Sequence, residues 1–280
     1  MKVLSEPILV QAQSHKWKQG RKTIGFVPTM GALHEGHLEL VRASRQKNSY
    51  TVVSIYVNPL QFGPKEDLAK YPRTMAEDLK LLQKEKVDLV FTPSDKEMYP
   101  EGFSSQVQVS GSLVQGLCAP FRPGHFNGVA TVVVKLLGAV QPTRLYLGQK
   151  DAQQAAVLKQ VIQDLNLDVE AVICPIVREP DGLAMSSRNK RLTPEGRKIA
   201  PLLYRSLKVG KSMATLGETD VKKVLTEVKK VISEERKVKL QYLEAVDAQT
   251  LQPVRQIKPG TMLALAAHLD NVRLIENIYL

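Results

Sequence analysis

Short apolar runs alternate with helical stretches through the first 175 residues, and this alternation restricts the possible folds more than any other feature of the sequence. Runs such as residues 23–28 and 50–57 are dense in apolar, β-branched and aromatic residues, which is typical of buried strands. The stretches between them repeat apolar residues at three- and four-residue spacing, which predicts amphipathic helices. Because alternating strands and helices form parallel βαβ units, we expect an α/β fold with a parallel sheet and helices on both faces.

The expected elements of this part also indicate where ligands bind. We expect strands at residues 23–28, 50–57, 88–91, 144–148 and 169–173, and helices at 37–48, 74–86, 126–140 and 151–165. In parallel sheets of this kind, ligands bind beyond the carboxyl ends of the strands. The binding residues are therefore expected at 28–37, 58–61, 148–154 and in the stretch after residue 173.

The pattern changes after about residue 176. Residues 194–213 and 218–233 are predicted to be helical, and strands are expected at 240–246, 261–266 and 271–279. This order predicts a smaller α+β domain. We therefore expect two domains, at residues 1–175 and 176–280.

The charge of the chain is unusual for an otherwise ordinary composition. The 39 Lys and Arg residues outnumber the 28 Asp and Glu residues, which leaves a net charge of +11. This excess fits either a solvated basic surface or attraction of a polyanion, which can be a nucleic acid or a small phosphate compound. Nucleic-acid-binding proteins interleave aromatic residues with basic clusters, and only 5% of this chain is aromatic, so we expect no nucleic-acid partner.

The compartment is predicted from cysteine content and hydropathy. Two cysteines, Cys118 and Cys174, cannot form a disulfide framework, which favours the reducing cytoplasm. No apolar run approaches the roughly 18 residues of a membrane span. The N-terminal residues also lack the pattern of a signal peptide, so we expect no membrane association.

Two histidines follow the first expected strand, in the run Pro-Thr-Met-Gly-Ala-Leu-His-Glu-Gly-His at residues 28–37. His34 and His37 lie at the start of the next expected helix, where unpaired N–H groups attract anions. Gly31 and Gly36 allow the backbone to approach a ligand closely, and imidazoles can donate hydrogen bonds to charge that develops during phosphoryl or nucleotidyl transfer. The same spacing also fits a solvated turn or half of a zinc site, although no further residues show zinc-ligand spacing.

Two other stretches contain residue types that suit phosphate. Ser186, Ser187 and Arg188 place two hydroxyls and a guanidinium in succession, and Arg can bind phosphate with two parallel hydrogen bonds. At residues 148–151, Lys150 can meet a phosphate and Asp151 a ribose hydroxyl, or Asp151 can simply cap a helix. The sequence has no Walker loop and no Gly-x-Gly-x-x-Gly, which argues against P-loop and dinucleotide-binding proteins.

Several motifs, in this order and at this spacing, closely resemble the pantothenate synthetase (pantoate–β-alanine ligase) family. They lie at residues 28–37, 57–63 (Val-Asn-Pro-Leu-Gln-Phe-Gly), 71–74 (Tyr-Pro-Arg-Thr), 122–126 (Arg-Pro-Gly-His-Phe), 148–154 and 182–189. The resemblance covers essentially the whole chain, and the ten-residue run at 28–37 is highly specific. This family is part of the nucleotidylyltransferase superfamily and is related in its core to class I aminoacyl-tRNA synthetases.

The resemblance implies a reaction and an architecture. ATP, (R)-pantoate and β-alanine would react in the presence of Mg²⁺ to give pantothenate, AMP and pyrophosphate, through a pantoyl-adenylate intermediate. Residues 1–175 would form a Rossmann-like domain that binds nucleotide and pantoate, and residues 176–280 would form a lid. The resemblance also implies a homodimer.

The resemblance further implies roles for individual residues. The implied catalytic residues are His37, which is the proton donor, and His34, Lys150 and Arg188. The residues implied to contact ATP are Met30, Gly31, His34, Gly36, His37, Gly148, Gln149, Lys150, Asp151, Val177, Met185, Ser186, Ser187 and Arg188. Gln61, Gln154 and Met30 would contact pantoate, and Gln61 would also adjoin β-alanine. Asp78, with Glu77, would be a magnesium neighbour, although a solvated helix face is the simpler explanation of that pair.

Three positions depart from the family pattern. Gln149 and Cys118 stand where glutamate is usual, and Ala152 stands where an aromatic residue is usual. The alternative enzyme class is a nucleotidylyltransferase that makes a dinucleotide or an activated alcohol. Gln61 and Gln154 argue against it, because that reaction has no use for two amides around a hydroxy acid.

Overall fold

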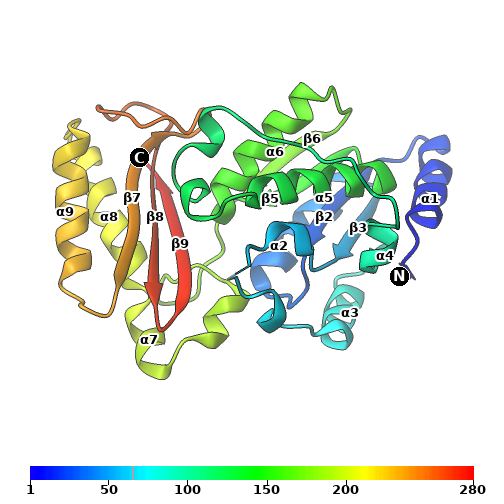
Figure 1. Ribbon diagram of the computed structural model, residues 1–280, viewed down its shortest axis with the longest axis horizontal. Helices are drawn as coiled ribbons and strands as arrows, with labels where there is room; N and C mark the ends of the chain where they lie inside the picture. The colour runs from blue at the N-terminus through cyan, green and yellow to red at the C-terminus, as the bar shows by residue number, and fades with distance from the viewer. Residues whose placement is uncertain (65) are drawn as a thin grey trace. The chain divides into compact units, whose positions relative to one another are not determined.

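The computed structural model describes residues 1–64 and 66–280 and divides them into two compact units (Figure 1). The first unit comprises residues 1–109, 122–149 and 157–175, and the second comprises residues 110–121, 150–156 and 176–280. The expected domain boundary after residue 175 coincides with the last position at which the chain passes from the first unit into the second. Two short earlier segments, which the sequence placed in the first part, are grouped with the second unit.

The first unit contains a six-stranded sheet in the order β1-β4-β3-β2-β5-β6, and every pairing is parallel. The strands are β1 (Lys2–Leu4), β2 (Ile24–Thr29), β3 (Tyr50–Ile55), β4 (Leu89–Phe91), β5 (Arg144–Gly148) and β6 (Glu170–Cys174). The central strands β2, β3 and β4 are almost entirely buried, as expected for a parallel sheet that is covered on both sides. The predicted parallel α/β fold is therefore confirmed.

Helices cover the sheet on both faces, because the chain reverses its direction across the sheet. It steps from β2 through β3 to β4, and then returns across the sheet to β5. Since such crossovers are right-handed, helices α2 and α3 lie on one face, while α1 and α5 lie together on the other. The helices are α1 (Pro7–Gln19), α2 (Glu35–Lys47), α3 (Met75–Lys84), the short α4 (Asp95–Met98), α5 (His125–Val140) and α6 (Ala152–Asp164).

The N-terminal β1 and α1 were not expected from the sequence. Strand β1 has only three residues and pairs at the edge of the sheet with β4. Helix α1 begins with Pro7 at a position that proline favours, but only Val10 and Ser14 of this helix are buried. Its apolar face is too narrow to produce a clear three- and four-residue pattern.

The second unit contains a three-stranded antiparallel sheet in the order β7-β8-β9, which confirms the predicted α+β part. The strands are β7 (Lys239–Asp247), β8 (Thr261–Leu269) and β9 (Val272–Tyr279), and the helices are α7 (Pro194–Ile199), α8 (Leu202–Thr215) and α9 (Val221–Ser233). Helices α8 and α9 pack together against one face of this sheet (Figure 1). Their shared core includes Val224, Val228 and Leu207 from the helices and Leu263 and Leu265 from β8.

The predicted single helix at 194–213 is wrong. The structure has two helices, α7 and α8, with Ala200 and Pro201 between them. Proline has no backbone N–H, and its ring collides with the carbonyl of the residue four positions earlier in a continuous helix. Pro201 therefore interrupts the helix even though the apolar spacing continues.

Helix α5 is buried along most of its 16 residues. Among the described residues, no helix is both long and apolar enough to cross a membrane.

A side-chain Cβ at Gly128 of α5 would overlap the backbone of Leu60 and Gln61. This glycine is what lets residues 60 and 61 lie directly against α5.

Replacing Gly128 with alanine is expected to lower the free energy of unfolding by roughly 1–3 kcal/mol, because the added methyl group must push the backbone at Leu60 away. The matched control is Gly138→Ala in the same helix, where a Cβ meets nothing within 4 Å. That control should instead stabilise the protein by about 0.5–1 kcal/mol, since alanine is the better helix former. Urea unfolding of both variants measures the difference, and equal effects would contradict this account of Gly128.

Candidate functional site

The first-unit binding residues predicted from the sequence lie along the edge of the parallel sheet that is formed by the carboxyl ends of its strands. Strands β2 and β3 end side by side, with Thr29 paired to Ile55. The loop after β2 leads into α2, and the loop after β3 leads into the 3-10 helix η1 (Pro59–Gln61). Strand β5 lies on the other side of β2 and ends at Gly148. The strand order changes direction between β2 and β5, and open parallel sheets bind ligands at such a point.

The loop between β2 and α2 is held by a buried carboxylate. Asp78 of α3 is 1% exposed. Its Oδ2 accepts a hydrogen bond from the Ala32 N–H (2.9 Å), and its Oδ1 accepts one from the Leu33 N–H (2.8 Å). The Thr74 hydroxyl also donates to both oxygens at 3.2 Å. A solvated helix face is therefore the wrong interpretation of Asp78, although Glu77 is exposed.

The backbone of this loop adopts a left-handed conformation at two successive residues. Gly31 has φ of 81° and Ala32 has φ of 50°. A Cβ at Gly31 would lie 3.0 Å from both Asp78 and Ile55, so glycine is required there for space as well as for φ. Asp78 compensates the unfavourable φ at Ala32 by accepting the hydrogen bond from its N–H.

His34 and His37 lie together at the start of α2. Their ring centroids are 4.0 Å apart, and both residues are half-buried. The His34 N–H donates to Nδ1 of His37 at 3.3 Å. A ring nitrogen that accepts a hydrogen bond carries no proton, so a neutral His37 holds its proton on Nε2. A neutral His37 is therefore a hydrogen-bond donor at Nε2.

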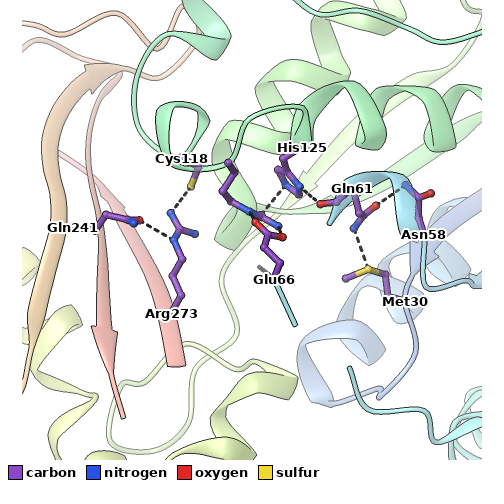
Figure 2. Close-up of polar contacts among 9 residues, drawn as sticks. Met30, Asn58, Gln61, Glu66, Cys118, His125, Gln241 and Arg273 are labelled. Atoms are coloured by element: carbon purple, nitrogen blue, oxygen red, sulfur yellow. Dashed lines mark hydrogen bonds and ion pairs between the residues drawn. The ribbon is translucent and has the colours of Figure 1, made fainter. Parts of the chain in front are cut away.

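Gln61 is held between two neighbours (Figure 2). Its Oε1 accepts a hydrogen bond from Nδ2 of Asn58 at 3.1 Å, and its Nε2 lies 3.0 Å from the sulfur of Met30. Asn58 is itself buried and also donates to the Gly128 carbonyl at 3.1 Å. The Tyr99 hydroxyl donates to Oδ1 of Asn58 at 2.6 Å. These contacts fix the orientation of the Gln61 amide and bring Met30 and Gln61 together. The contact of both residues with pantoate stays a prediction.

His125 contacts the backbone of Gln61 (Figure 2), and Arg122 in turn contacts His125. Nδ1 of His125 lies 2.8 Å from the Gln61 carbonyl, and Nε2 lies 2.8 Å from the Arg122 guanidinium. Because Arg can only donate, Nε2 accepts and the Nδ1–H donates to the carbonyl. Arg122 also makes two 2.7 Å bonds to Glu66. Burial alone would raise the pKa of Glu66, but the hydrogen bonds and charge of Arg122 outweigh it and lower that pKa below its usual value.

A cavity of about 410 Å³ adjoins the β2–α2 loop in the first unit. The residues that line it include Met30, Gly31, Tyr56, Arg73 and Asp78. The Tyr56 hydroxyl donates to Asp95 at 2.9 Å. This cavity lies within the range of small-ligand pockets and is next to the predicted site.

In the second unit, residues 177–185 form a short hairpin. Arg178 and Ala184 form an antiparallel bridge, and the Met185 N–H donates to the Val177 carbonyl at 3.0 Å. Gly182, with φ of 94°, makes the turn. Val177 and Met185 are thus brought together, and their contact with adenine stays a prediction.

Ser186, Ser187 and Arg188 follow directly from this hairpin. Oγ of Ser186 accepts a hydrogen bond from the Arg188 N–H at 3.3 Å and caps the 3-10 helix η6 (Ser187–Arg191). The Asn189 side chain ties this helix back to the hairpin by donating to the Ala184 carbonyl at 3.0 Å. The three residues predicted to bind phosphate therefore lie at the start of a hydrogen-bonded turn.

Lys150, Asp151 and Gln154 belong to the short segment 150–156 of the second unit. The Lys150 ammonium lies 3.6 Å from the Asp151 carboxylate. Gln153, next to Gln154, is buried and bonds to the Cys118 N–H at 2.8 Å and to the Leu113 carbonyl at 2.8 Å. Gln154 itself remains partly exposed.

Cys118, one of the family departures, contacts a cation. Its sulfur lies 3.3 Å from the Arg273 guanidinium and 3.2 Å from the Tyr242 hydroxyl, and Arg273 also donates to Gln241 at 2.8 Å (Figure 2). Cys118 is a buried free thiol.

The predicted site residues thus fall into two groups. The first unit brings together Met30, Gly31, His34, Gly36, His37 and Gln61 on adjacent loops, with Gly148 and Gln149 at the same sheet edge. The second unit carries Lys150, Asp151, Gln154, Val177, Met185, Ser186, Ser187 and Arg188. Asn58 and His125 were not assigned roles from the sequence, although both lie in the motifs at 57–63 and 122–126, and only the fold shows that they hold Gln61.

Comparison with known proteins identifies the family. The model of the family described as "Pantoate-beta-alanine ligase" matches residues 2–279. The chain belongs to the pantoate–β-alanine ligase family. It is 52% identical over 280 residues to a pantothenate synthetase of Thermotoga petrophila, with the whole of both chains covered. It is 54% identical over 267 residues to that of Thermotoga neapolitana, with 95% of both chains covered.

Solved structures of this family agree with the fold. The crystal structure of pantothenate synthetase from Thermus thermophilus is 44% identical, with a TM-score of 0.95 over 100% of this chain and 99% of that one. The pantoate–β-alanine ligase of Francisella tularensis, described as complexed with beta-gamma ATP and β-alanine, is 32% identical, with a TM-score of 0.82 over 100% and 97%. The family inferred from the sequence motifs is therefore confirmed.

Replacing Asp78 with alanine leaves the buried N–H groups of Ala32 and Leu33 without their acceptor. We expect the free energy of unfolding to fall by about 1–3 kcal/mol, the usual effect of leaving buried polar groups unpaired. Glu77→Ala, on the same turn of α3 but exposed, is the control and should change it by less than about 0.5 kcal/mol. Urea denaturation compares the two, and similar values for both variants would show that Asp78 does not hold the loop.

Proposed function

We propose that this ligase runs the ATP-dependent condensation of pantoate with β-alanine in two steps at the loops described above. In the first step, a carboxylate oxygen of (R)-pantoate attacks the α-phosphorus of ATP, and pyrophosphate leaves. In the second step, the β-alanine amine attacks the acyl carbon of pantoyl adenylate, the amine loses a proton, and AMP leaves. One observation carries this proposal. His34, His37 and Gln61 lie on adjacent loops, where the strand order of the sheet changes direction between β2 and β5, and the neighbours of Gln61 already orient its amide.

His37 and His34 are assigned to the ATP phosphates. The α-phosphate gains negative charge on its oxygens in the transition state, so N–H donors and cations stabilise it. Nδ1 of His37 accepts from the backbone, so we assign its Nε2–H as the donor to a phosphate oxygen. His37 is therefore assigned as the proton donor of this family's reaction, with Met30, Gly31 and Gly36 lining the nucleotide.

Gln61 and Gln154 are assigned to pantoate, with Met30 beside them. Neutral amides can orient the hydroxyls of pantoate without protonating its carboxylate or pairing with it as an ion, so the carboxylate remains nucleophilic. The Gln61 amide is already oriented by Asn58. The same amide is assigned to β-alanine in the second step.

The remaining ATP contacts are assigned to Gly148 and Gln149 of the first unit and to the two segments of the second unit. Lys150 and Arg188 supply positive charge to the phosphates, and Ser186 and Ser187 supply hydroxyls. Asp151 is assigned to the ribose, and Val177 and Met185 to the adenine. Because pantoyl adenylate hydrolyses easily, we propose that the second unit acts as a lid that excludes water.

We propose that Mg²⁺ binds to this enzyme together with ATP. Mg²⁺ is usually held by substrate phosphates and one or two carboxylates. Among the residues that the structure describes, no group of three His, Cys, Asp or Glu side chains can hold a metal ion. Both oxygens of Asp78 already accept hydrogen bonds from the loop, so Asp78 does not fit a direct magnesium ligand, and no step above depends on one.

The assembly and the compartment are also proposals. The family resemblance supports a homodimer, and two free cysteines that are both buried suit the reducing cytoplasm. Small-molecule substrates and no nucleic acid remain the proposed partners, with the positive charge serving to attract ATP and pantoate, which are both anions.

AMP release tests the reaction directly. Purified protein with ATP, Mg²⁺, pantoate and β-alanine should form AMP, pyrophosphate and pantothenate in equal amounts, and omission of β-alanine should stop AMP release while bound pantoyl adenylate accumulates. Coupled AMP detection and mass spectrometry measure both. AMP formed only with another acid or another amine would overturn the substrate assignment.

His37→Ala should slow the adenylation step by about 10²–10⁴-fold if His37 assists proton transfer. Single-turnover formation of pantoyl adenylate from ATP and pantoate measures this step alone. His15→Ala, on the exposed surface of α1, is the control and should leave the rate unchanged. An adenylation rate for His37→Ala near that of the unaltered enzyme would remove His37 from this role.

A further inference from the structure

We propose that Glu276 and Asn277, two successive residues near the end of β9, position both of the ATP-binding segments of the second unit. Neither residue belongs to the motifs that identify the family's site. The proposal rests on the ATP contacts assigned above to Lys150 and to the segment 177–188. It adds that these two neighbouring residues of β9 hold the two segments at a fixed spacing from each other.

The two side chains leave β9 on opposite faces, because successive residues of a strand alternate. Val272, Leu274 and Ile278 belong to the core that β9 forms with α8 and α9. Glu276 lies two positions from both Leu274 and Ile278, so its side chain is on the same face as theirs. The Asn277 side chain is on the other face. One strand can therefore reach two segments that are far apart in the sequence.

Asn277 holds the Lys150 segment. It is 4% exposed, and its Nδ2 donates to the Lys150 carbonyl at 3.1 Å. The carbonyl and the ammonium belong to the same residue, so a shift of the Lys150 backbone moves the charge that is assigned to the phosphates. Asn277 therefore acts on ATP through Lys150, as a positioning residue.

Glu276 holds the hairpin 177–185. Its carboxylate is 3% exposed and makes two parallel bonds with the Arg178 guanidinium, at 2.7 and 2.9 Å. Arg178 also donates to the Gly182 carbonyl at 3.0 Å, and its guanidinium stacks 3.5 Å from the centre of the Tyr204 ring. A two-bond Arg–carboxylate pair fixes direction as well as distance. Glu276 thus sets the orientation of the hairpin from which Ser186, Ser187 and Arg188 extend.

The contact of Asn277 with Lys150 and the contact of Glu276 with Arg178 are linked through the backbone that joins these two residues of β9. Oε1 of Glu276 also accepts a hydrogen bond from the Asn277 N–H at 2.9 Å, so the backbone between the two side chains is held as well. Lys150 and the hairpin consequently keep one spacing within the second unit. Two cationic groups that bind one triphosphate require such a fixed spacing, because misplacement of either weakens binding.

The first variant is Asn277→Ala. It removes one hydrogen bond to a backbone carbonyl, and we expect the KM for ATP in the adenylation step to rise by about 3- to 10-fold, with the KM for pantoate changed less than about twofold. Glu276→Gln keeps the shape of the side chain but places an amide N–H₂ against Arg178, and should raise the KM for ATP to a similar extent. If Asn277→Ala does not fold, Asn277→Asp replaces it, because a carboxylate of nearly the same size cannot donate to the Lys150 carbonyl.

The matched control is Gln241→Ala in the same sheet. Gln241 accepts a hydrogen bond from Arg273 at 2.8 Å, and among the residues that the structure describes it has no hydrogen bond to either ATP segment. It should lower the melting temperature as the test variants do, but leave the KM for ATP unchanged. A purely structural role of Asn277 predicts that Asn277→Ala behaves in the same way as this control, and that result would overturn the proposal.

A double-mutant cycle with Lys150→Ala separates this proposal from the site assignment. If Asn277 acts through Lys150, Asn277→Ala should add little to the KM for ATP once Lys150 is already alanine. A raised KM in Lys150→Ala together with an unchanged KM in Asn277→Ala would overturn the positioning role alone. An unchanged KM in Lys150→Ala would overturn the assigned contact of Lys150 with ATP, and the role of Asn277 with it.

Discussion

Thr29 and Ile55 end adjacent parallel strands and pair with each other, so the loops that follow β2 and β3 leave the sheet side by side. The contacts between the loop after β2 and the loop after β3 depend on this pairing. It brings the Met30 sulfur to the Gln61 amide, and it places the start of α2 at the same edge of the sheet. A shift of one residue in the strand register would invert the faces of β2 and separate these loops.

Buried polar side chains then fix each loop by binding its backbone. Asp78 accepts from the β2–α2 loop, Asn58 and His125 bind residues around Gln61, and Asn277 binds the Lys150 carbonyl. A buried polar group is costly unless it is hydrogen-bonded, so each of these residues favours a single arrangement of its loop. The groups assigned to the substrates can then remain imidazoles, amides and half-buried cations, and other residues set the positions of several of them.

Much of the fold was predictable because burial imposes periodicity. Strand β5 and helix α5 lie within one residue of their predicted bounds, since both are strongly apolar. The prediction failed where periodicity was weak or was overruled. Helix α1 buries too few residues to show a pattern, and Pro201 divides a stretch whose apolar spacing continues. The segments 110–121 and 150–156 are grouped with the second unit by contacts with residues more than a hundred positions away, which no local pattern reveals.

The sequence by itself determined the class of fold, the family and the chemical types at the site, because apolar spacing and the motif at residues 28–37 are local properties. It could not determine which polar residues face substrate and which support the residues that do. Asp78 was expected near a metal ion or in solvent, yet its carboxylate holds two backbone N–H groups. Asn58, His125, Glu276 and Asn277 were given no role. Only the tertiary structure decided these roles, because a hydrogen bond depends on distances and directions between groups that the chain separates by many residues.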